Sequence, residues 1–416
     1  MAYTYEHRSR VLNRLGIKSM INARNWDTAI GGTYLEPEVI EAMADVAKTF
    51  VNMRELLDKA SKRVAELCGV DAAYITSGAA AGITMSAAAS ITGRDEAKWT
   101  RLPFTDDPPV NGRNKIIIQA NQSAYDIQYA AGGARLIKIG GPEGTNPSDL
   151  EVAVDNETAA IAAGYHYNVV PRGWIPYEAV AKTARKYGLP CFCDCAGAFP
   201  PYENLHKINE MGFDLTIFSG GKGIRGPQDS GLVLGKGQRG IELVEEMRRH
   251  SSPNPGIGRP FKVSKENIVG LVTALELVLS KDEHYEYAEQ LAKAEYMEKA
   301  LRGIPGIEVS VVHNDGKSYE HPLMAHVPVV RLDLDKEALR LSTVESVYDA
   351  MASGEPGIYI RHPRFEDPEY GPFTSKASVF LFTYYLRNGE EKIVADRMKE
   401  VLTARPWAKQ IGSRGQ

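Results

Sequence analysis

The segment Ser219-Gly220-Gly221-Lys222-Gly223 places a reactive side-chain type in a glycine-rich turn. It directly follows the apolar run Leu215–Phe218, and a short β-prone run bounded by glycines predicts a buried strand. Lys222 therefore stands where a core strand ends, and its glycine neighbours leave room for a planar group beside the amine. Partial burial favours the neutral amine, which attacks carbonyl carbons to form a Schiff base. The alternative is a surface lysine in a strand-to-loop turn.

A nucleotide-binding phosphate loop is excluded for this lysine. That loop requires Ser or Thr directly after the lysine, to bind the metal ion, and here Gly223 follows.

A second segment, Tyr74-Ile75-Thr76-Ser77-Gly78-Ala79, predicts a short strand, a tight turn and the start of a helix. The unpaired N–H groups and the dipole of a helix N-terminus suit a phosphate. Close packing of the helix is the alternative explanation for the small residues.

A third segment, Cys191-Phe192-Cys193-Asp194, is an apolar strand with one carboxylate at its end. A buried carboxylate needs a cationic partner, because an unpaired buried charge is costly. A protonated pyridine nitrogen would serve, and pyridoxal 5'-phosphate (PLP) carries that nitrogen, a phosphate and an aldehyde. Alternatively, Asp194 caps the following turn.

The order of phosphate loop, aspartate and lysine resembles the fold-type I PLP enzymes. The string Phe218–Gln228 is similar to the lysine motif of the L-seryl-tRNA(Sec) selenium transferase and D-glucosaminate-6-phosphate ammonia-lyase group. Four further strings fit the same group, closer to its ammonia-lyase side: Ile21-Asn22-Ala23, Pro37-Glu38-Val39, Ser123-Ala124-Tyr125-Asp126 and Ile257–Val263. The resemblance covers about residues 20 to 400 and is most specific around Lys222.

The resemblance implies roles for the cofactor-binding residues. Lys222 would hold PLP covalently and then act as the base that removes the α-proton, while Asp194 would keep the ring nitrogen protonated. The phosphate would be bound by Ser77, Gly78, Ala79 and Ser219. The group usually places a histidine or arginine against the ring, but this chain has Asn121-Gln122-Ser123, so Gln122 and Tyr125 are the candidates for stacking.

Further residues are candidates for substrate contacts. Arg361 is our choice for the substrate carboxylate, with Arg259 and Arg225 as rivals, and a surface ion pair is the alternative for each. His166 and Asn168 follow a buried strand and are candidates for the cofactor's phenolic oxygen or the substrate. For His166 a satisfied loop histidine is the alternative.

Alternating helical and extended segments predict an α/β fold, and the resemblance specifies it as the fold-type I PLP-dependent transferase fold. We expect a large domain with a mostly parallel seven-stranded sheet and a small C-terminal α+β domain. The predicted domains are an N-terminal arm at 1–35, a PLP-binding domain at 36–289 and a small domain at 290–416.

Individual helices and strands are also predicted. One helix is expected to have Val180, Ala184 and Tyr187 on its inner face. The predicted strands of the two domains are 74–76, 115–119, 135–139, 159–163, 191–194, 215–218 and 231–234, then 308–312, 328–332, 358–361 and 378–382.

The composition of the chain gives no sign of a nucleic-acid partner. The formal net charge of the 416 residues is −4, which gives no indication of a nucleic-acid footprint. No run approaches the roughly 18 apolar residues of a membrane span, so we expect a cytoplasmic protein.

Of its four cysteines, Cys191, Cys193 and Cys195 alternate along one strand and would share one face. They are predicted to be small buried residues, and no metal is expected, because one strand cannot surround a tetrahedral ion.

These observations predict a PLP-dependent lyase that acts on an amino acid or amino sugar acid by α,β-elimination, giving a 2-oxo acid and ammonia. An aldolase, a racemase, a selenium-transferase-like enzyme and an inactive binding protein on the same fold are the alternatives. The resemblance also implies a homodimer or higher homo-oligomer, and we expect the arm around Ile30-Gly31-Gly32 to complete a neighbouring subunit's active site.

Overall fold

The computed structural model describes residues 9–120, 125–141, 144–165, 173–313, 327–341, 343–360 and 378–405. It divides into two compact units, one of Gly31–Lys281 and one that combines Met1–Ile30 with Asp282–Gln416. The first 30 residues, predicted as part of an arm, are thus grouped with the C-terminal part of the chain.

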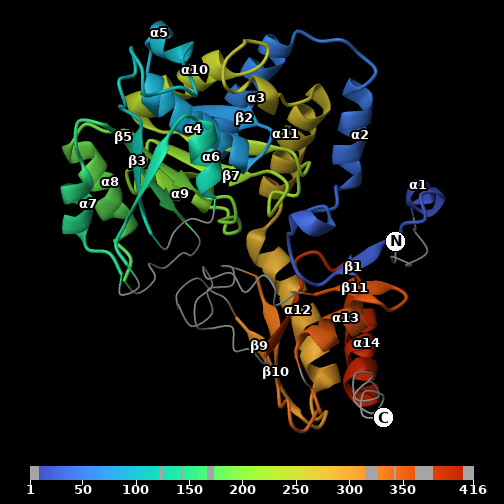
Figure 1. Ribbon diagram of the computed structural model, residues 1–416. Coiled ribbons are helices and arrows are strands. Elements are labelled where there is room, and N and C mark those ends of the chain that lie inside the picture. The colour runs from blue at the N-terminus through green and yellow to red at the C-terminus, as the bar shows by residue number, and fades with distance from the viewer. Residues whose placement is uncertain are drawn as a thin grey trace, which may run out of the picture. The chain divides into compact units, whose positions relative to one another are not determined.

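The Gly31–Lys281 unit is built on the predicted mostly parallel sheet of seven strands (Figure 1). The strand order is β2-β8-β7-β6-β5-β3-β4; β8 runs antiparallel to β2 and β7, and the other neighbouring strands pair in parallel. The strands are β2 (Ala72–Thr76), β3 (Lys115–Gln119), β4 (Arg135–Ile139), β5 (Thr158–Gly164), β6 (Cys191–Asp194), β7 (Leu215–Ser219) and β8 (Gly231–Gly235). All seven residues of β5 and all four of β6 are buried, as expected for strands covered on both faces.

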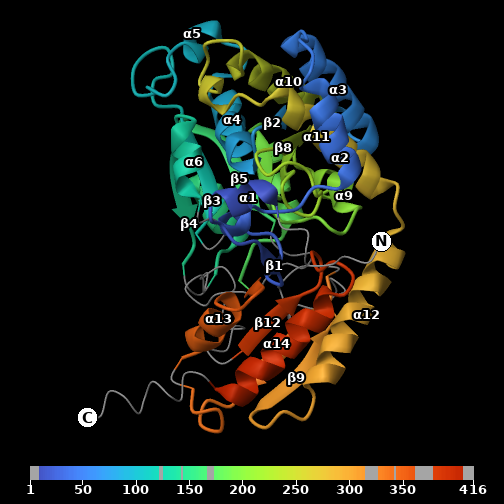
Figure 2. The same cartoon turned by 90° about the vertical axis from the view of Figure 1, so that its right-hand side faces the viewer.

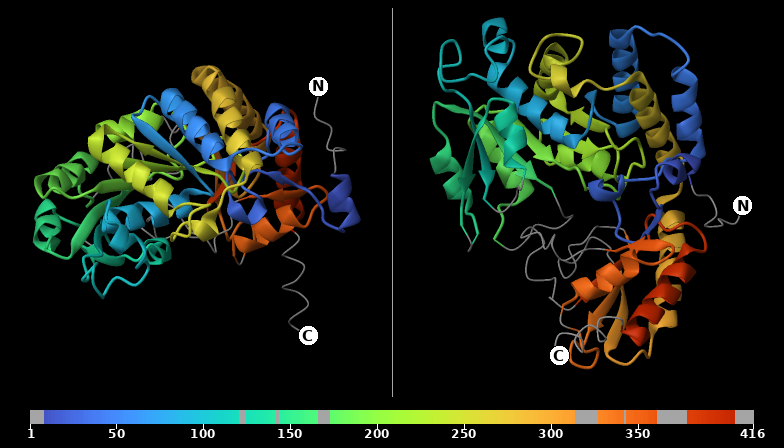
Figure 3. Two further views of the ribbon diagram at one scale, coloured as in Figure 1. Left: turned by 90° about the horizontal axis from the view of Figure 1, so that it is seen from above. Right: turned by 45° about the vertical axis from the view of Figure 1, so that its right-hand side comes forward.

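Helices cover both faces of this sheet (Figures 1 and 3). One face packs against α4 (Ala79–Thr92), α6 (Asp126–Ala131) and α10 (Gly237–His250). The other face packs against α3 (Met53–Cys68), α7 (Pro147–Ala153), α8 (Tyr177–Lys186), α9 (Asn204–Glu210) and α11 (Lys265–Leu279). The helix α2 (Pro37–Val46), opened by Pro37 as predicted, packs on α11.

The predicted inner face of one helix includes one residue that lies beyond the end of that helix. Val180 and Ala184 are buried in α8, but α8 ends at Lys186 and Tyr187 is 40% exposed. The spacing is helical, but Tyr187 lies beyond the last residue of the helix, so it does not face the core.

The second unit contains an antiparallel sheet with the order β12-β10-β9. Its strands are β9 (Ile307–Val312), β10 (Val329–Leu334) and β12 (Ser378–Phe382), and its helices are α12 (Glu283–Leu301), α13 (Glu345–Ala352) and α14 (Glu390–Ala404). Figure 2 shows α12 and α14 side by side, and both contribute to one apolar core.

The N-terminal segment is part of this second core. The strand β1 (Met20–Asn22) pairs in parallel with β11 (Gly357–Tyr359), and Ala23 bonds to both Tyr359 and Phe382 through its backbone. Ile21 and Ala23 are fully buried, so the segment has an apolar core that the sequence analysis did not anticipate. None of the helices among the described residues is long and apolar enough to cross a membrane.

Candidate active site

Lys222 and Asp194 lie at the same edge of the large sheet. The strands β6 and β7 are parallel neighbours, with Asp194 opposite Ile217, so their carboxyl ends meet. Asp194 ends β6, and Lys222 lies in the turn that follows β7. The predicted arrangement on successive strands is therefore present.

The Ser77-Gly78 turn lies at this edge as well. The strands β2 and β7 flank β8, and Gly231 of β8 stands opposite both Thr76 and Ser219. A Cβ atom on Gly231 would lie 2.6 Å from the Gly78 carbonyl carbon, so only glycine lets β8 approach this turn. All three segments with predicted chemistry thus converge on one sheet edge, where ligands of open α/β sheets bind.

The turn that carries Lys222 is fixed by its own backbone. Gly220 N–H donates to the Ser230 carbonyl and Gly226 N–H to the Gly220 carbonyl, both at 2.8 Å. Lys222 is half-buried, and its carbonyl accepts from Arg225 N–H at 2.8 Å. Arg225 adopts a left-handed backbone with φ of 60°, a conformation that costs a non-glycine residue energy.

The glycines beside Lys222 have a different role from the predicted one. A Cβ on Gly221 would lie 2.3 Å from Cα of Gln228, and one on Gly223 would lie 2.0 Å from the Phe199 carbonyl oxygen. Protein backbone, rather than open space for a ligand, fills the volume that these missing side chains leave. The glycines allow the turn to pack tightly, and this packing fixes the position of Lys222.

Gly32 also packs against this turn, within the same chain. With φ of 73°, its Cβ would lie 2.7 Å from the Gly221 carbonyl oxygen.

Asp194 is buried, and both its side chain and its backbone carbonyl accept hydrogen bonds. It is 8% exposed, and its Oδ1 accepts from Ala196 N–H at 3.0 Å. Tyr165 N–H donates to its carbonyl at 2.7 Å.

Tyr129 of α6 is a neighbour of Asp194 that the sequence analysis missed. Its ring stacks on Phe192 with 6.0 Å between centroids and is 1% exposed. Burial, with a smaller contribution from the Asp194 charge, raises the pKa of Tyr129 well above its usual range. The sequence gives no local signal for this contact, because Tyr129 lies on a short helix far from Asp194 along the chain.

The N-terminus of α4 has the features of a phosphate site. No side chain caps this helix of 14 residues. Its N-cap Gly78 has φ of 128°, and a Cβ there would meet nothing within 4 Å, so the space in front of the helix is open. Uncapped N–H groups, a buried carboxylate and a lysine at one sheet edge fit the phosphate, ring nitrogen and aldehyde of PLP.

The other residues predicted to contact the substrate or the cofactor do not all lie near Lys222. Arg225 is buried three residues beyond Lys222, whereas Arg259 is exposed in a short 3-10 helix (Arg259–Phe261). Tyr125, a stacking candidate, is 49% exposed at the start of α6. Gln122, His166, Asn168 and Arg361 lie outside the described residues.

Gln119 is a further polar residue at this edge that the sequence analysis missed. It ends β3, is 2% exposed and accepts from Ile175 N–H at 2.7 Å. Its buried Nε2 has no hydrogen-bond partner among the residues that the structure describes. A polar residue at the end of an apolar strand was the available signal.

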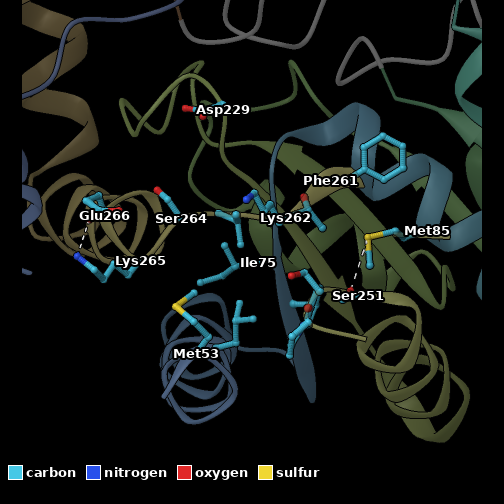
Figure 4. A pocket seen from close by; sticks show the side chains of 16 residues that line it. Met53, Ile75, Met85, Asp229, Ser251, Phe261, Lys262, Ser264, Lys265 and Glu266 are labelled. Atoms are coloured by element: carbon cyan, nitrogen blue, oxygen red, sulfur yellow. Dashed lines mark hydrogen bonds and ion pairs between the residues drawn. The ribbon is translucent and has the colours of Figure 1, made fainter. Parts of the chain in front are cut away.

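A cavity of about 420 Å³ lies beside the edge strand β2 (Figure 4). Its lining includes Thr76, next to the Ser77-Gly78 turn, and Asp229, next to the lysine turn. Neither Lys222 nor Asp194 lines it. Thr76 also donates to the Gly78 carbonyl at 2.8 Å, so the cavity wall and the turn are directly joined.

The cysteines are buried and free. Burial raises the pKa of the Cys68 thiol to about 12, and it raises the pKa values of the Cys191 and Cys193 thiols well above their usual range. Among the described residues, no group of three or more His, Cys, Asp and Glu side chains is arranged to hold a metal ion.

The chain is similar in sequence to one known protein family and to several characterised proteins. The aminotransferase class-V family model matches residues 118–325. The chain is 31% identical over 357 residues to the 5'-C-glycyluridine monooxygenase-decarboxylase of a Streptomyces species, covering 83% of each protein. It is 26% identical over 398 residues to the D-glucosaminate-6-phosphate ammonia lyase of Salmonella typhimurium, covering 94% of this chain and 97% of that protein.

Two further similarities extend the comparison. An L-seryl-tRNA(Sec) selenium transferase from Aquifex aeolicus is 25% identical over 347 residues, covering 75% of this chain and 71% of the relative. The solved structure of a D-glucosaminate-6-phosphate ammonia-lyase has the same fold, with a TM-score of 0.75 and 24% identity over 95% of this chain and 99% of that one.

Proposed function

Because this chain belongs to the aminotransferase class-V family and is a PLP-dependent enzyme, we propose that it is a lyase acting at the α-carbon of an amino acid or amino sugar acid. The reaction is an α,β-elimination, in which the α-proton and a β-hydroxyl leave the substrate as water, and hydrolysis of the resulting enamine releases ammonia and leaves a 2-oxo acid. The convergence of Lys222, Asp194 and the α4 N-terminus on one sheet edge supports α-carbon chemistry. The choice of elimination is supported by similarity to the ammonia lyase over 97% of its length.

The residues of the sheet edge have distinct roles in this proposal. When bound, PLP supplies an electron sink for the carbanion at the α-carbon. Lys222 would hold the cofactor aldehyde through Nζ, and its amine would act as the base that takes the α-proton of the substrate. Asp194 holds the proton on the ring nitrogen. Ser77, Gly78, Ala79 and Ser219 bind the phosphate with N–H groups and hydroxyls.

The substrate contacts are proposals of the same kind. Arg361 binds the substrate carboxylate, with Arg225 and Arg259 as alternatives, since a guanidinium matches a carboxylate with two hydrogen bonds. Of these alternatives, Arg225 lies in the lysine turn and is 9% exposed. His166 and Asn168 contact the cofactor's phenolic oxygen or the substrate, and Gln122 or Tyr125 stacks on the ring.

A second candidate function is oxidative decarboxylation of an amino acid. It is supported by the 31% identity to a protein named as a monooxygenase and decarboxylase. The two reactions are separated by their products, because an elimination needs no oxygen and releases no carbon dioxide.

The deciding experiment incubates the PLP-loaded enzyme with D- and L-amino acids and amino sugar acids, including phosphorylated ones. Ammonia and a 2-oxo acid formed without oxygen consumption support the lyase. Oxygen uptake with release of carbon dioxide supports the decarboxylase instead. Glycine plus an aldehyde indicates an aldolase, and a change of optical rotation alone indicates a racemase.

The partner is proposed to be a small molecule. The net charge of −4 offers no excess of positive charge for an RNA backbone. Tight, salt-sensitive binding of seryl-tRNA in a filter-binding assay would overturn this part of the proposal.

Lys222→Ala tests the covalent attachment of the cofactor. Wild-type protein is expected to be yellow, and borohydride reduction followed by peptide mapping should label Lys222, because this lysine lies in the turn after a core strand, at the predicted cofactor edge. The variant should lack the visible absorption band. Lys262→Ala, at a lysine of the neighbouring cavity, is the matched control and should keep it. Labelling of a different lysine would contradict the assignment.

A further inference from the structure

A second cavity, of about 230 Å³, lies in the Gly31–Lys281 unit near the start of α3 and the end of α10. Three arginines line it: Arg54 from α3, and Arg248 and Arg249 from the last turn of α10. The other lining residues are Leu57, Asp58, Tyr74, Ser252, Pro253 and Asn254.

The described lining carries three arginines and one carboxylate, and one of the arginines has no carboxylate partner among the described residues. Asp58 is its one carboxylate and pairs with Arg248. Arg249 is held from outside the cavity by Glu96 at 3.0 Å and Glu246 at 3.6 Å. Arg54 donates to the side-chain oxygen of Asn254 at 2.9 Å and pairs with no carboxylate in the part of the chain that the structure describes.

The guanidinium groups are held by neighbouring residues. Asn254 accepts from Arg54 and donates to the Arg248 carbonyl at 3.1 Å, so one amide joins α3 to the end of α10. The Arg248 guanidinium lies over the Tyr74 ring, 5.7 Å from its centroid. Burial lowers the pKa of Arg248, which shows that this cation is partly withdrawn from water. Groups positioned in this way lose little entropy when they bind an anion.

We propose that this cavity binds the phosphate group of a small phosphorylated metabolite. Arginine forks match phosphate oxygens with paired, charge-assisted hydrogen bonds, and a phosphate supplies a charged partner for Arg54, which pairs with no carboxylate among the described residues. The volume suits a phosphate and a few attached atoms, since pockets for whole drug-sized ligands begin at about 300 Å³.

The 420 Å³ cavity has room for the rest of such a molecule (Figure 4). The two cavities share Leu57, Tyr74, Ser252 and Pro253 as lining residues, so they adjoin. The larger one reaches Thr76, directly before the Ser77-Gly78 turn, whereas the arginines line the smaller one alone. The phosphate site is therefore distinct from the predicted site of the cofactor phosphate at Gly78.

The test is isothermal titration calorimetry on the PLP-loaded enzyme, in which the cofactor's own phosphate site is filled. Inorganic phosphate and glucose 6-phosphate are titrated separately at constant ionic strength. Both probes should bind, and tighter binding of the ester would assign the site to a phosphorylated metabolite rather than to free phosphate. Chloride at the same ionic strength should give no saturable heat.

Arg54→Gln should weaken the binding of both probes about tenfold or more, because it removes a charge-assisted hydrogen bond. Arg54 is exposed, so this variant is expected to fold. Arg302→Gln, at an exposed arginine of the other unit that pairs with Glu298, is the matched control and should bind as wild type does. Equal affinity of the Arg54 and Arg302 variants, or no saturable binding by the wild type, would overturn the proposal. The readout is independent of turnover, so failure here and failure of the lyase proposal are distinguishable.

Discussion

At the scale of single residues, Asp194 and Lys222 differ in how deeply they are buried. Asp194 is almost fully buried at a strand end, with Tyr129 and Phe192 packed nearby. Lys222 is half-buried in a turn fixed by hydrogen bonds and by glycine packing. A buried carboxylate acts strongly on a nearby cation, because little water screens the charge.

Asp194→Asn should therefore keep the cofactor and lose turnover. A neutral amide cannot hold the ring nitrogen protonated, so loss of this electrostatic interaction should lower the rate about 10²-fold. Single-turnover spectra of the variant with its best substrate would measure the effect. Asp214→Asn, at another partly buried carboxylate of the same sheet region, is a control that should not abolish turnover. Wild-type rates in the Asp194 variant would remove this residue from the site.

At the scale of elements, the contact between α4 and α10 contains a buried polar cluster. The Thr92 hydroxyl lies 3.1 Å from Nε2 of His250 and 3.3 Å from Oε1 of Glu246. Both titratable side chains are at most 2% exposed. Burial, aided by the nearby Arg249 charge, lowers the pKa of His250 to about 4, and burial raises the pKa of Glu246.

This cluster makes the free energy of unfolding depend on pH. Between pH 6.5, the usual pKa of a histidine, and about 4, the unfolded chain binds a proton at His250 that the folded chain does not. The His250 contribution is thus lost as the pH falls, by about 2 kcal/mol between pH 7 and pH 5. Glu246 acts in the opposite direction, because its raised pKa lets the folded chain bind a proton first.

We predict that His250→Gln loses about 2 kcal/mol less unfolding free energy than the wild type when the pH is lowered from 7 to 5. Urea denaturation at the two pH values measures the difference. His250→Asn should behave in the same way, which separates the loss of titration from a change of packing. An equal loss in wild type and both variants would show that His250 does not account for the pH dependence.

The elements themselves could largely be predicted from the sequence. Lys115–Gln119 and Cys191–Asp194 are strands with the predicted bounds, because each is a short apolar run that ends at a polar residue. The pairing of β1 with β11 could not be predicted, since it joins residues more than 300 positions apart and has no local pattern. The contact of Tyr129 with the Asp194 region was missed for the same reason. The glycines beside Lys222 were located correctly, but their packing partners depend on the fold.

At the scale of the whole molecule, apolar surface points to self-association. Phe50 is fully exposed, and Ile40 and Val51 are 54% and 38% exposed, on α2 and its connection to α3. Another part of the α2 surface is already used, because Val39 is buried and α11 packs against this helix. Apolar side chains gathered on one short segment are typical of interfaces, and the predicted homodimer would bury them.

Phe50→Ser should raise the dissociation constant of the homodimer about tenfold or more, since an aromatic side chain at the centre of an interface commonly contributes over 1.4 kcal/mol. Sedimentation equilibrium over a range of concentrations measures this. Val152→Ser is the matched control, because Val152 is 85% exposed on α7, which packs near the opposite edge strand β4. A dissociation constant that changes equally in both variants would place the interface elsewhere. A wild-type protein that is monomeric and fully active would contradict both the dimer and the completion of the site by a neighbouring subunit.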